Sequence, residues 1–179
     1  ACESASPSEV VVRIQTVRTV DAPTPSLVLV QARAKGDRDE LAVQATTELG
    51  VDAVLPWSSS RSVSRWEGPQ IAEGISLCAT IVREASKQAH RARVPGVGPL
   101  VSTANLVALA STSRMLLLEP TATTALTALS LRDETNDIVL VVGPEGGFAP
   151  EELERLTAAG ATQVRLGETV LRTSTAGPA

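Results

Sequence analysis

Two strand-like runs that each break into a glycine loop constrain the fold of this chain more than any other feature. The apolar, largely β-branched run Ile138–Val142 is followed at once by Gly143–Gly147, and the shorter run Val164–Leu166 is followed by Gly167. Such runs are typical of buried strands that open into turns, where the backbone can approach a ligand closely. Because ligands of open parallel sheets bind outside the carboxyl ends of the strands, the two loops predict two walls of one ligand crevice.

The chemistry of the first loop narrows the kind of ligand. The chain has no Gly-Lys-Ser/Thr phosphate loop and no Gly-x-Gly-x-x-Gly that opens a helix. Glu145 lies inside the loop, where its carboxylate would repel a phosphate. A cationic or neutral ligand with hydrogen-bonding edges fits better, and the sulfonium and adenine of S-adenosylmethionine meet that description. On the pattern alone, an ordinary strand-turn-helix whose glycines serve only tight turning stays open as the alternative.

Strand-like and helix-like segments alternate along the rest of the chain, which predicts an α/β domain with a mainly parallel sheet. Residues 10–20 alternate partly, as a half-buried strand does, and residues 22–25 form a proline-containing linker. The pattern Asp37-x-x-Glu40 predicts a capping box that starts a helix. The remaining expected strands are 27–30, 51–55, 115–118, 138–142 and 164–166, and the expected helices are 37–50, 71–89, 121–129, 150–160 and a last one from 171 onward.

A basic stripe accompanies the helix expected over residues 71–89. Its apolar positions recur every three or four residues, and Arg83, Lys87 and Arg91 are spaced four apart on a neighbouring stripe, with Arg93 close behind. Like charges at this spacing repel each other, and an anionic partner would offset the repulsion. A solvated helix face is the alternative that the pattern alone leaves open.

Composition excludes several classes of protein. Among 179 residues there is one Phe, two Trp and no Tyr, so the core must be aliphatic and stacking platforms for single-stranded nucleic acid are nearly absent. The net charge of −4 does not by itself indicate a nucleic-acid binder. Two lone cysteines and one His predict neither a disulfide framework nor a metal site. No apolar run reaches the ~18 residues of a membrane span and no signal segment leads the chain, so we expect a soluble cytoplasmic protein.

Several ordered motifs resemble the ribosomal RNA small-subunit methyltransferase E family, which belongs to the SPOUT class of knotted methyltransferases. That family carries a Gly-Pro-Glu-Gly-Gly loop, then Leu-Gly, then Leu-Arg-Thr-x-Thr-Ala. The matching segments here are Gly143–Gly147, Leu166–Gly167, Leu171–Ala176, and the upstream blocks Lys35–Arg38, Thr47–Asp52, Gln88–Arg91 and Val94–Pro95. Two positions depart from the pattern, because Ser174 and Lys87 stand where the family usually has Glu.

The resemblance implies an α/β fold with a SPOUT-type parallel sheet and a C-terminal trefoil knot, preceded by the remnant of a PUA-like β-barrel domain. Residues 1–22 would be the end of that N-terminal RNA-binding domain, and residues 23–179 the methyltransferase domain. Since the chain lacks an initiator Met and stops within an expected helix, we expect it to be part of a longer protein.

The resemblance also implies an activity, namely methyl transfer from S-adenosylmethionine to N3 of a uridine in 16S ribosomal RNA of the small subunit, by a homodimer without a metal. It implies catalytic roles for Arg91 and Arg172, and RNA contacts for Arg83, Lys87, Arg91 and Arg93. The expected cofactor-binding residues are Leu118, Glu119, Gly143, Glu145, Gly146, Gly147, Leu166, Gly167, Val170, Leu171 and Thr173. A methyltransferase acting on transfer RNA, an inactive RNA-binding module and a small-molecule-binding α/β domain are the alternatives.

Overall fold

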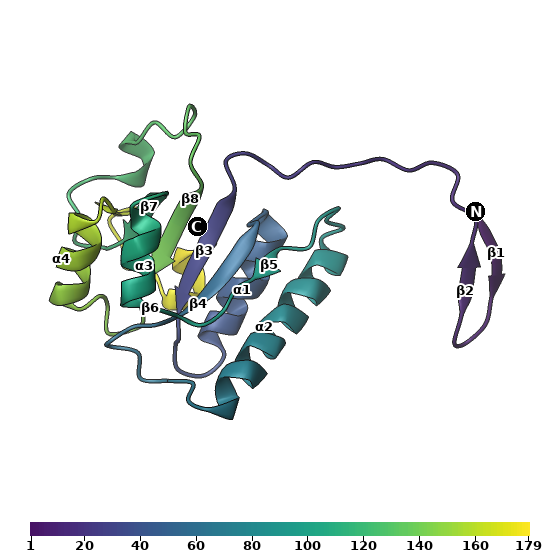
Figure 1. Cartoon of the computed structure of the whole chain (residues 1–179), viewed down its shortest axis with the longest axis horizontal. Coiled ribbons are helices and arrows are strands. Elements are labelled where there is room, and N and C mark those ends of the chain that lie inside the picture. Colours follow the sequence, from purple (N-terminus) through teal and green to yellow (C-terminus); the bar gives the residue numbers. More distant parts are fainter.

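A seven-stranded sheet organises the chain, and every neighbouring pair of its strands runs parallel (Figure 1). The computed structural model describes residues 1–179. The strands, in order across the sheet, are β5 (Gly96–Val97), β4 (Ala53–Ser58), β3 (Leu27–Ala32), β8 (Ile138–Val142), β7 (Arg114–Leu118) and β9 (Thr162–Val164), and β6 (Val101–Ser102) also pairs with β4. The α/β class with a parallel sheet, predicted from the sequence, is confirmed.

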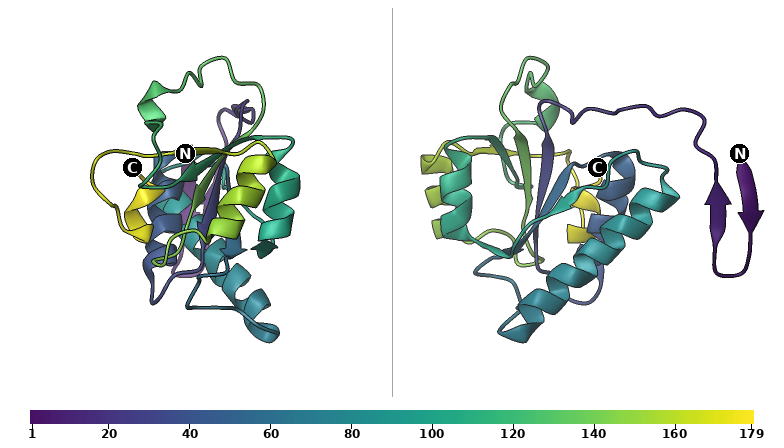
Figure 2. Two further views of the ribbon diagram at one scale, coloured as in Figure 1. Left: turned by 90° about the vertical axis from the view of Figure 1, so that its left-hand side faces the viewer. Right: turned by 45° about the vertical axis from the view of Figure 1, so that its right-hand side comes forward.

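Helices cover both faces of the sheet, so its strands are apolar on both sides (Figures 1 and 2). On β7, Met115 and Leu117 pack into the core on one face, whereas Leu116 and Leu118 pack into the core on the other. This alternation follows from the two-residue period of a strand. One face carries α1 (Arg38–Leu49), α2 (Pro69–Gln88) and α5 (Thr173–Ala176), and the other carries α3 (Thr103–Ala110) and α4 (Pro150–Ala158).

The N-terminal segment forms a small hairpin apart from the sheet (Figure 2). Strands β1 (Cys2–Ala5) and β2 (Val10–Val12) pair antiparallel, and an extended segment joins them to β3. The predicted half-buried strand over residues 10–20 is wrong in length and in burial, because only Val10–Val12 is a strand and all its residues are exposed. Cys2, the first residue of β1, pairs with Val12, the last residue of β2, so both strands stop at the same end of the hairpin.

The helix predicted over residues 121–129 is also wrong, since only a short 3₁₀ turn, Leu126–Ala128, forms there. The four threonines of this segment are β-branched and disfavour an α-helix. The backbone pairs instead with Arg165, whose amide donates to the carbonyl of Thr124 and whose carbonyl accepts from Leu126. The Arg165 side chain donates to the carbonyls of Ala122 and Thr123 as well.

Helix starts are only partly as predicted. Asp37 does precede α1, but its side chain makes no capping hydrogen bond, so the predicted capping box is wrong. A true capping box starts α3, a helix that the sequence analysis missed: Ser102 accepts from the amide of Asn105, and the Asn105 side chain accepts from the amide of Ser102. Asn in place of Glu or Gln at the third helical position hides this box from the usual pattern.

Arg91 does not continue the stripe of α2, contrary to the sequence-based prediction. The helix ends at Gln88, and His90 has a φ of 52°, which turns the chain away from the helix axis. Nη1 of Arg91 then donates to the carbonyl oxygens of Thr47 at 2.8 Å and Val51 at 2.6 Å. These carbonyls lie at and just beyond the C-terminal end of α1, so Arg91 joins that helix end to the start of β4.

The ion pair of Arg91 extends the same network to the sheet. Its guanidinium lies 3.8 Å from the carboxylate of Asp52, which in turn accepts a hydrogen bond from the amide of Leu27 at 2.9 Å. The Arg91 side chain is only 15% exposed. The network therefore ties α1, β3 and β4 together where the strands begin.

We predict that Arg91→Ala lowers the free energy of unfolding by about 2–3 kcal/mol, because partly buried carbonyls lose a charged donor. Chemical denaturation monitored by circular dichroism measures this. Arg83→Ala is the matched control: its side chain is 67% exposed, and we expect a change within about 0.5 kcal/mol. Equal stabilities of the two variants would contradict the role of Arg91 in the fold.

Candidate functional site

A cavity of about 310 Å³ lies at the edge of the sheet where β7, β8 and β9 end. Its walls include Leu118 at the end of β7, Gly143 directly after β8, and Leu166 shortly after β9. Ligand cavities in proteins typically measure about 300–1,000 Å³, so the space suits a small molecule. Both predicted glycine loops therefore border one cavity.

Most residues predicted to bind a cofactor meet in this cavity, although they come from three separate segments. Arg172, predicted as catalytic, lies there too, whereas Gly146 is not in the wall. The predicted residues that line the cavity are Leu118, Glu119, Gly143, Glu145, Gly147, Leu166, Gly167, Val170, Leu171, Arg172 and Thr173. A second, more apolar cavity of about 280 Å³ lies next to it and shares Leu118, Leu166 and Ala176 with it.

The loop after β8 turns tightly enough to need glycine. The amide of Gly147 donates to the carbonyl of Pro144 at 2.9 Å, and Gly147 has a φ of 68°, in the left-handed region. Gly146 is constrained differently, because a side chain there would come within 3.3 Å of the Cβ of Arg61. Its backbone therefore packs against the loop that carries Arg61. The prediction that Gly146 faces the ligand is not supported by this position.

Glu145 holds the same loop from the other side. Its Oε1 accepts hydrogen bonds from the amide of Lys35 at 3.0 Å and from Nη1 of Arg38 at 2.9 Å. Burial alone would raise the pKa of Glu145, but hydrogen bonds from backbone amides and Arg38, together with the charge of Arg38, outweigh burial and hold that pKa below its ordinary value. Glu145 is thus a carboxylate at neutral pH and anchors the loop to the start of α1.

The segment that contributes Lys35 and Arg38 is itself well anchored. Arg33 and Asp39 form a buried ion pair on either side of it, and the Arg33 guanidinium stacks 4.2 Å from the ring centre of Trp66. Burial lowers the pKa of Arg33 from its ordinary value. The block Lys35–Arg38 was a signal in the sequence, but its partner Glu145 lies far along the chain and was not predictable from spacing.

Arg61 and Glu152 complete the support of the glycine loop, and neither was predicted from the sequence. Nη1 of Arg61 donates to the carbonyl of Gly146 at 3.1 Å. Its neighbour Ser60 is held by Glu152, whose Oε1 accepts from the Ser60 amide and from Oγ1 of Thr103, both at 2.9 Å. Glu152 is only 3% exposed. The one hint in the sequence is its position three residues after Ala149, whose amide it also caps.

Arg172 differs from Arg38 and Arg61, whose guanidinium groups are hydrogen-bonded to Glu145 and to the carbonyl of Gly146. Its side chain is exposed and takes part in none of the ion pairs of the chain. It directly precedes α5, whose first residue, Thr173, is buried. A cation that lines a cavity without an internal partner is available to an anionic group of a ligand or substrate.

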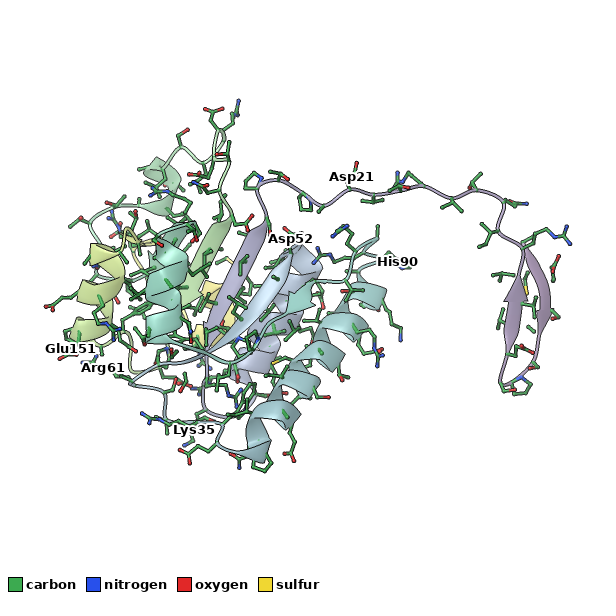
Figure 3. The ribbon with its side chains drawn as sticks, in the orientation of Figure 1. Asp21, Lys35, Asp52, Arg61, His90 and Glu151 are labelled. Carbon is green, nitrogen blue, oxygen red and sulfur yellow. The ribbon has the colours of Figure 1, made fainter.

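The residues of the predicted basic stripe lie away from this cavity. Figure 3 shows His90 and Asp52 at one end of the sheet, and Lys35 and Arg61 at the opposite end. Arg83 and Lys87 are exposed on α2 and share the carboxylate of Glu84, at 3.7 Å and 2.8 Å. The structure therefore does not bring Arg91, predicted as catalytic, together with Arg172.

Two further features bear on function. No group of three or more His, Cys, Asp or Glu side chains is arranged to hold a metal ion. None of the helices combines the length and the apolar character that crossing a membrane requires.

Comparison with known proteins finds relatives of this chain among RNA methyltransferases. The family model of the RNA methyltransferase domain matches residues 21–179. A curated relative, ribosomal RNA small subunit methyltransferase E of Mycobacterium bovis, is 43% identical over 157 residues, which cover 85% of this chain and 60% of the relative. The relative of the same name from Bacillus subtilis is 32% identical, over 79% of this chain and 58% of its own length.

A solved structure agrees with these matches. The ribosomal RNA small subunit methyltransferase E of Neisseria gonorrhoeae, solved bound to S-adenosylmethionine, superposes with a TM-score of 0.78 at 31% identity, over 90% of this chain and 66% of that one. The chain thus spans about 60% of the length of the curated relatives that it matches. From the family model, which covers the whole sheet and the cavity, we conclude that the chain belongs to the RNA methyltransferase domain family.

Proposed function

We propose that this protein is an S-adenosylmethionine-dependent methyltransferase that methylates N3 of a uridine in 16S ribosomal RNA of the small subunit. The single observation that carries the proposal is the convergence of both glycine loops and Arg172 on one cavity in an RNA methyltransferase domain. The 43% identity to a ribosomal RNA small subunit methyltransferase E supports the choice of substrate.

The cavity fits the proposed cofactor in its chemistry. Leu118, Val142, Leu166 and Leu171 supply apolar surface for adenine, and the backbone of the two glycine loops supplies polar groups beside it. The carboxylate of Glu119 accepts from the amide and hydroxyl of Thr121, so a negative charge, compatible with a sulfonium, is fixed at the cavity. When bound, S-adenosylmethionine supplies an electrophilic methyl group.

The residues of this chain align the reactants and stabilise the charge that develops during methyl transfer. The loops position the reacting groups, which is a large part of catalysis when two reactants must be aligned. Arg172 stabilises the negative charge that develops on a uracil oxygen as the N3 proton leaves to solvent. Glu145 does not act as the general base, because its lowered pKa and its bonds to Arg38 and Lys35 make it a weak proton acceptor.

Ser174 does not act as the base either, since it has no carboxylate. Arg91 receives no catalytic role in this proposal, because its guanidinium is bonded to carbonyl groups at the opposite edge of the sheet. Contacts of Arg83, Lys87 and Arg93 with RNA stay a prediction, which is tested below against a basic surface nearer to the cavity.

Finer features of the family also belong to the proposal. A C-terminal trefoil knot is supported by the path of the chain: β9 lies beside β7, yet Gly177 packs beside Leu29 of β3 and Val142 of β8. We further propose that residues 1–22 belong to a PUA-like domain and residues 23–179 to the methyltransferase domain. A homodimer, which the family resemblance implies, completes the proposal, together with a cytoplasmic location, where a ribosomal substrate is found.

The direct test uses small ribosomal subunits from cells that lack this protein, incubated with the purified protein and tritiated S-adenosylmethionine. We expect N3-methyluridine in 16S ribosomal RNA after nucleoside digestion and mass spectrometry. Methylation of transfer RNA alone would favour the transfer-RNA alternative. Cofactor binding without any methyl transfer would favour an inactive RNA-binding module.

We predict that Arg172→Ala lowers kcat at least 10²-fold, in the range of about 10²–10³ typical of a lost charge-stabilising donor, while the cofactor dissociation constant changes far less. Arg172→Lys should restore part of kcat, since it keeps the charge. A loss of cofactor affinity as large as the loss of kcat would assign Arg172 to cofactor binding, against the proposed role.

We predict that Arg38→Ala weakens binding of S-adenosylhomocysteine about tenfold, because the glycine loop loses its charged anchor at Glu145. Isothermal titration calorimetry measures the affinity. Arg18→Ala, which removes an exposed arginine from the N-terminal segment, is the control and should bind like the unaltered protein.

The lowered pKa of Glu145 predicts how cofactor affinity depends on pH. The ion pair of Glu145 with Arg38, and with it the affinity for S-adenosylhomocysteine, should persist from neutral pH down to the ordinary carboxyl range and be lost only below it. An affinity that already declines between pH 8 and pH 6 would contradict this.

A further inference from the structure

Three basic residues stand on the loops that follow β3 and β4, at the end of the sheet where the cavity lies, and neither the family resemblance nor the comparisons assign them a role. Lys35 lies after β3, and Arg61 and Arg65 lie after β4. The side chains of all three residues are exposed. Figure 3 shows Lys35 and Arg61 at the same end of the molecule, the end at which the strands reach their carboxyl termini. We call Lys35, Arg61 and Arg65 the basic rim.

Two residues of the rim are attached to the glycine loop, and the third is attached to the loop that carries Arg61. The amide of Lys35 is bonded to Glu145, and Nη1 of Arg61 is bonded to the carbonyl of Gly146, so both residues are attached to the glycine loop. Arg65 donates through Nη2 to the carbonyl of Ser60, directly before Arg61. Each guanidinium is therefore oriented by one bond while its other N–H groups stay free for a ligand.

The charges of the rim are not neutralised within the chain. Lys35, Arg61 and Arg65 take part in none of its ion pairs. The anionic Glu145 next to them is already paired with Arg38. Glu151, at the start of α4, is the acid that Figure 3 shows near Arg61, and it forms no ion pair. Asp37, two residues after Lys35, and Glu67, two residues after Arg65, are exposed acids that form no ion pair either. The three cations of the rim therefore stand at this edge without an ion-pair partner.

The basic stripe on α2 compares poorly as a phosphate-binding surface near the reaction. Arg83 and Lys87 share the carboxylate of Glu84, and the guanidinium of Arg91 is hydrogen-bonded to carbonyl groups of the fold. The C-terminal end of α2 lies at the opposite end of the sheet from the cavity (Figure 3). A nucleotide whose base enters the cavity has its flanking phosphates at the mouth, within reach of groups that stand there.

We propose that the basic rim of Lys35, Arg61 and Arg65 binds the phosphates that flank the target nucleotide of the RNA substrate. The inference rests on the proposed function, because it takes the cavity to be the place where the base reacts. The rim orients the RNA backbone at the cavity mouth, and Arg172 within the cavity is left to the base.

The experiment compares two double variants that each remove two positive charges. One is Lys35→Gln with Arg65→Gln in the rim, and the other is Arg83→Gln with Arg93→Gln in the stripe. The probe is a fluorescent synthetic RNA hairpin of 16S sequence that contains the uridine methylated by the unaltered protein, titrated at several salt concentrations. Calorimetry with S-adenosylhomocysteine shows in parallel whether the cavity is intact.

We expect the rim variant to flatten the slope of log K against log salt by about 1.5, since each lost phosphate contact contributes about 0.7–0.9. Its affinity for S-adenosylhomocysteine should equal that of the unaltered protein, and the stripe variant should keep the original slope. Arg61→Gln should weaken RNA binding and Arg61→Lys should restore part of it. Glu151→Gln should strengthen RNA binding, because it removes the acid near Arg61.

The opposite pattern would overturn the inference: an unchanged slope in the rim variant and a flattened one in the stripe variant, while the unaltered protein methylates the hairpin. In that case the proposed function stands and only the placement of the RNA changes. If the unaltered protein neither binds nor methylates RNA, the proposed function fails and the basic rim fails with it.

Discussion

The parallel direction of all strands in the sheet is the constraint on which the rest of this structure depends. When every strand runs the same way, every loop that follows a strand leaves the sheet at one edge, and every loop that precedes a strand lies at the other. The loops after β7, β8 and β9 therefore meet around one cavity, although they are far apart in the sequence. The sheet order changes direction between β3 and β8, and Glu145 with Lys35 and Arg38 bridges that point.

The two edges use arginine for different purposes. At the amino-terminal edge, Arg91 is bonded to carbonyl groups and to Asp52, so its charge serves the fold. At the carboxyl-terminal edge, Arg38 and Arg61 hold the glycine loop, while Arg172 has no partner in the chain. A charge that is already bonded within the fold stabilises it, whereas a charge left without a partner beside a cavity is available to a ligand.

The sequence was informative where local pattern determines structure. The bounds of β8 were predicted correctly, because a continuous β-branched run between turn residues has few alternatives. The meeting of the two glycine loops followed from the same reasoning. Arg91 was misplaced because periodicity assumed that α2 continues, and the left-handed turn at His90 leaves no mark in a sequence pattern. The contacts of Glu145 with Lys35 and Arg38 were not predicted, because they join residues more than a hundred positions apart in the sequence, and no local rule covers that separation.

A crystal structure of this chain with S-adenosylhomocysteine decides whether the cavity between the two glycine loops is the cofactor site. We expect the adenine to lie between Leu118 and Leu171, against the backbone of Gly143 and Gly167, with the Glu145–Arg38 ion pair intact. Ligand density in the neighbouring apolar cavity beside Leu27 and Leu140, or elsewhere on the molecule, would contradict it.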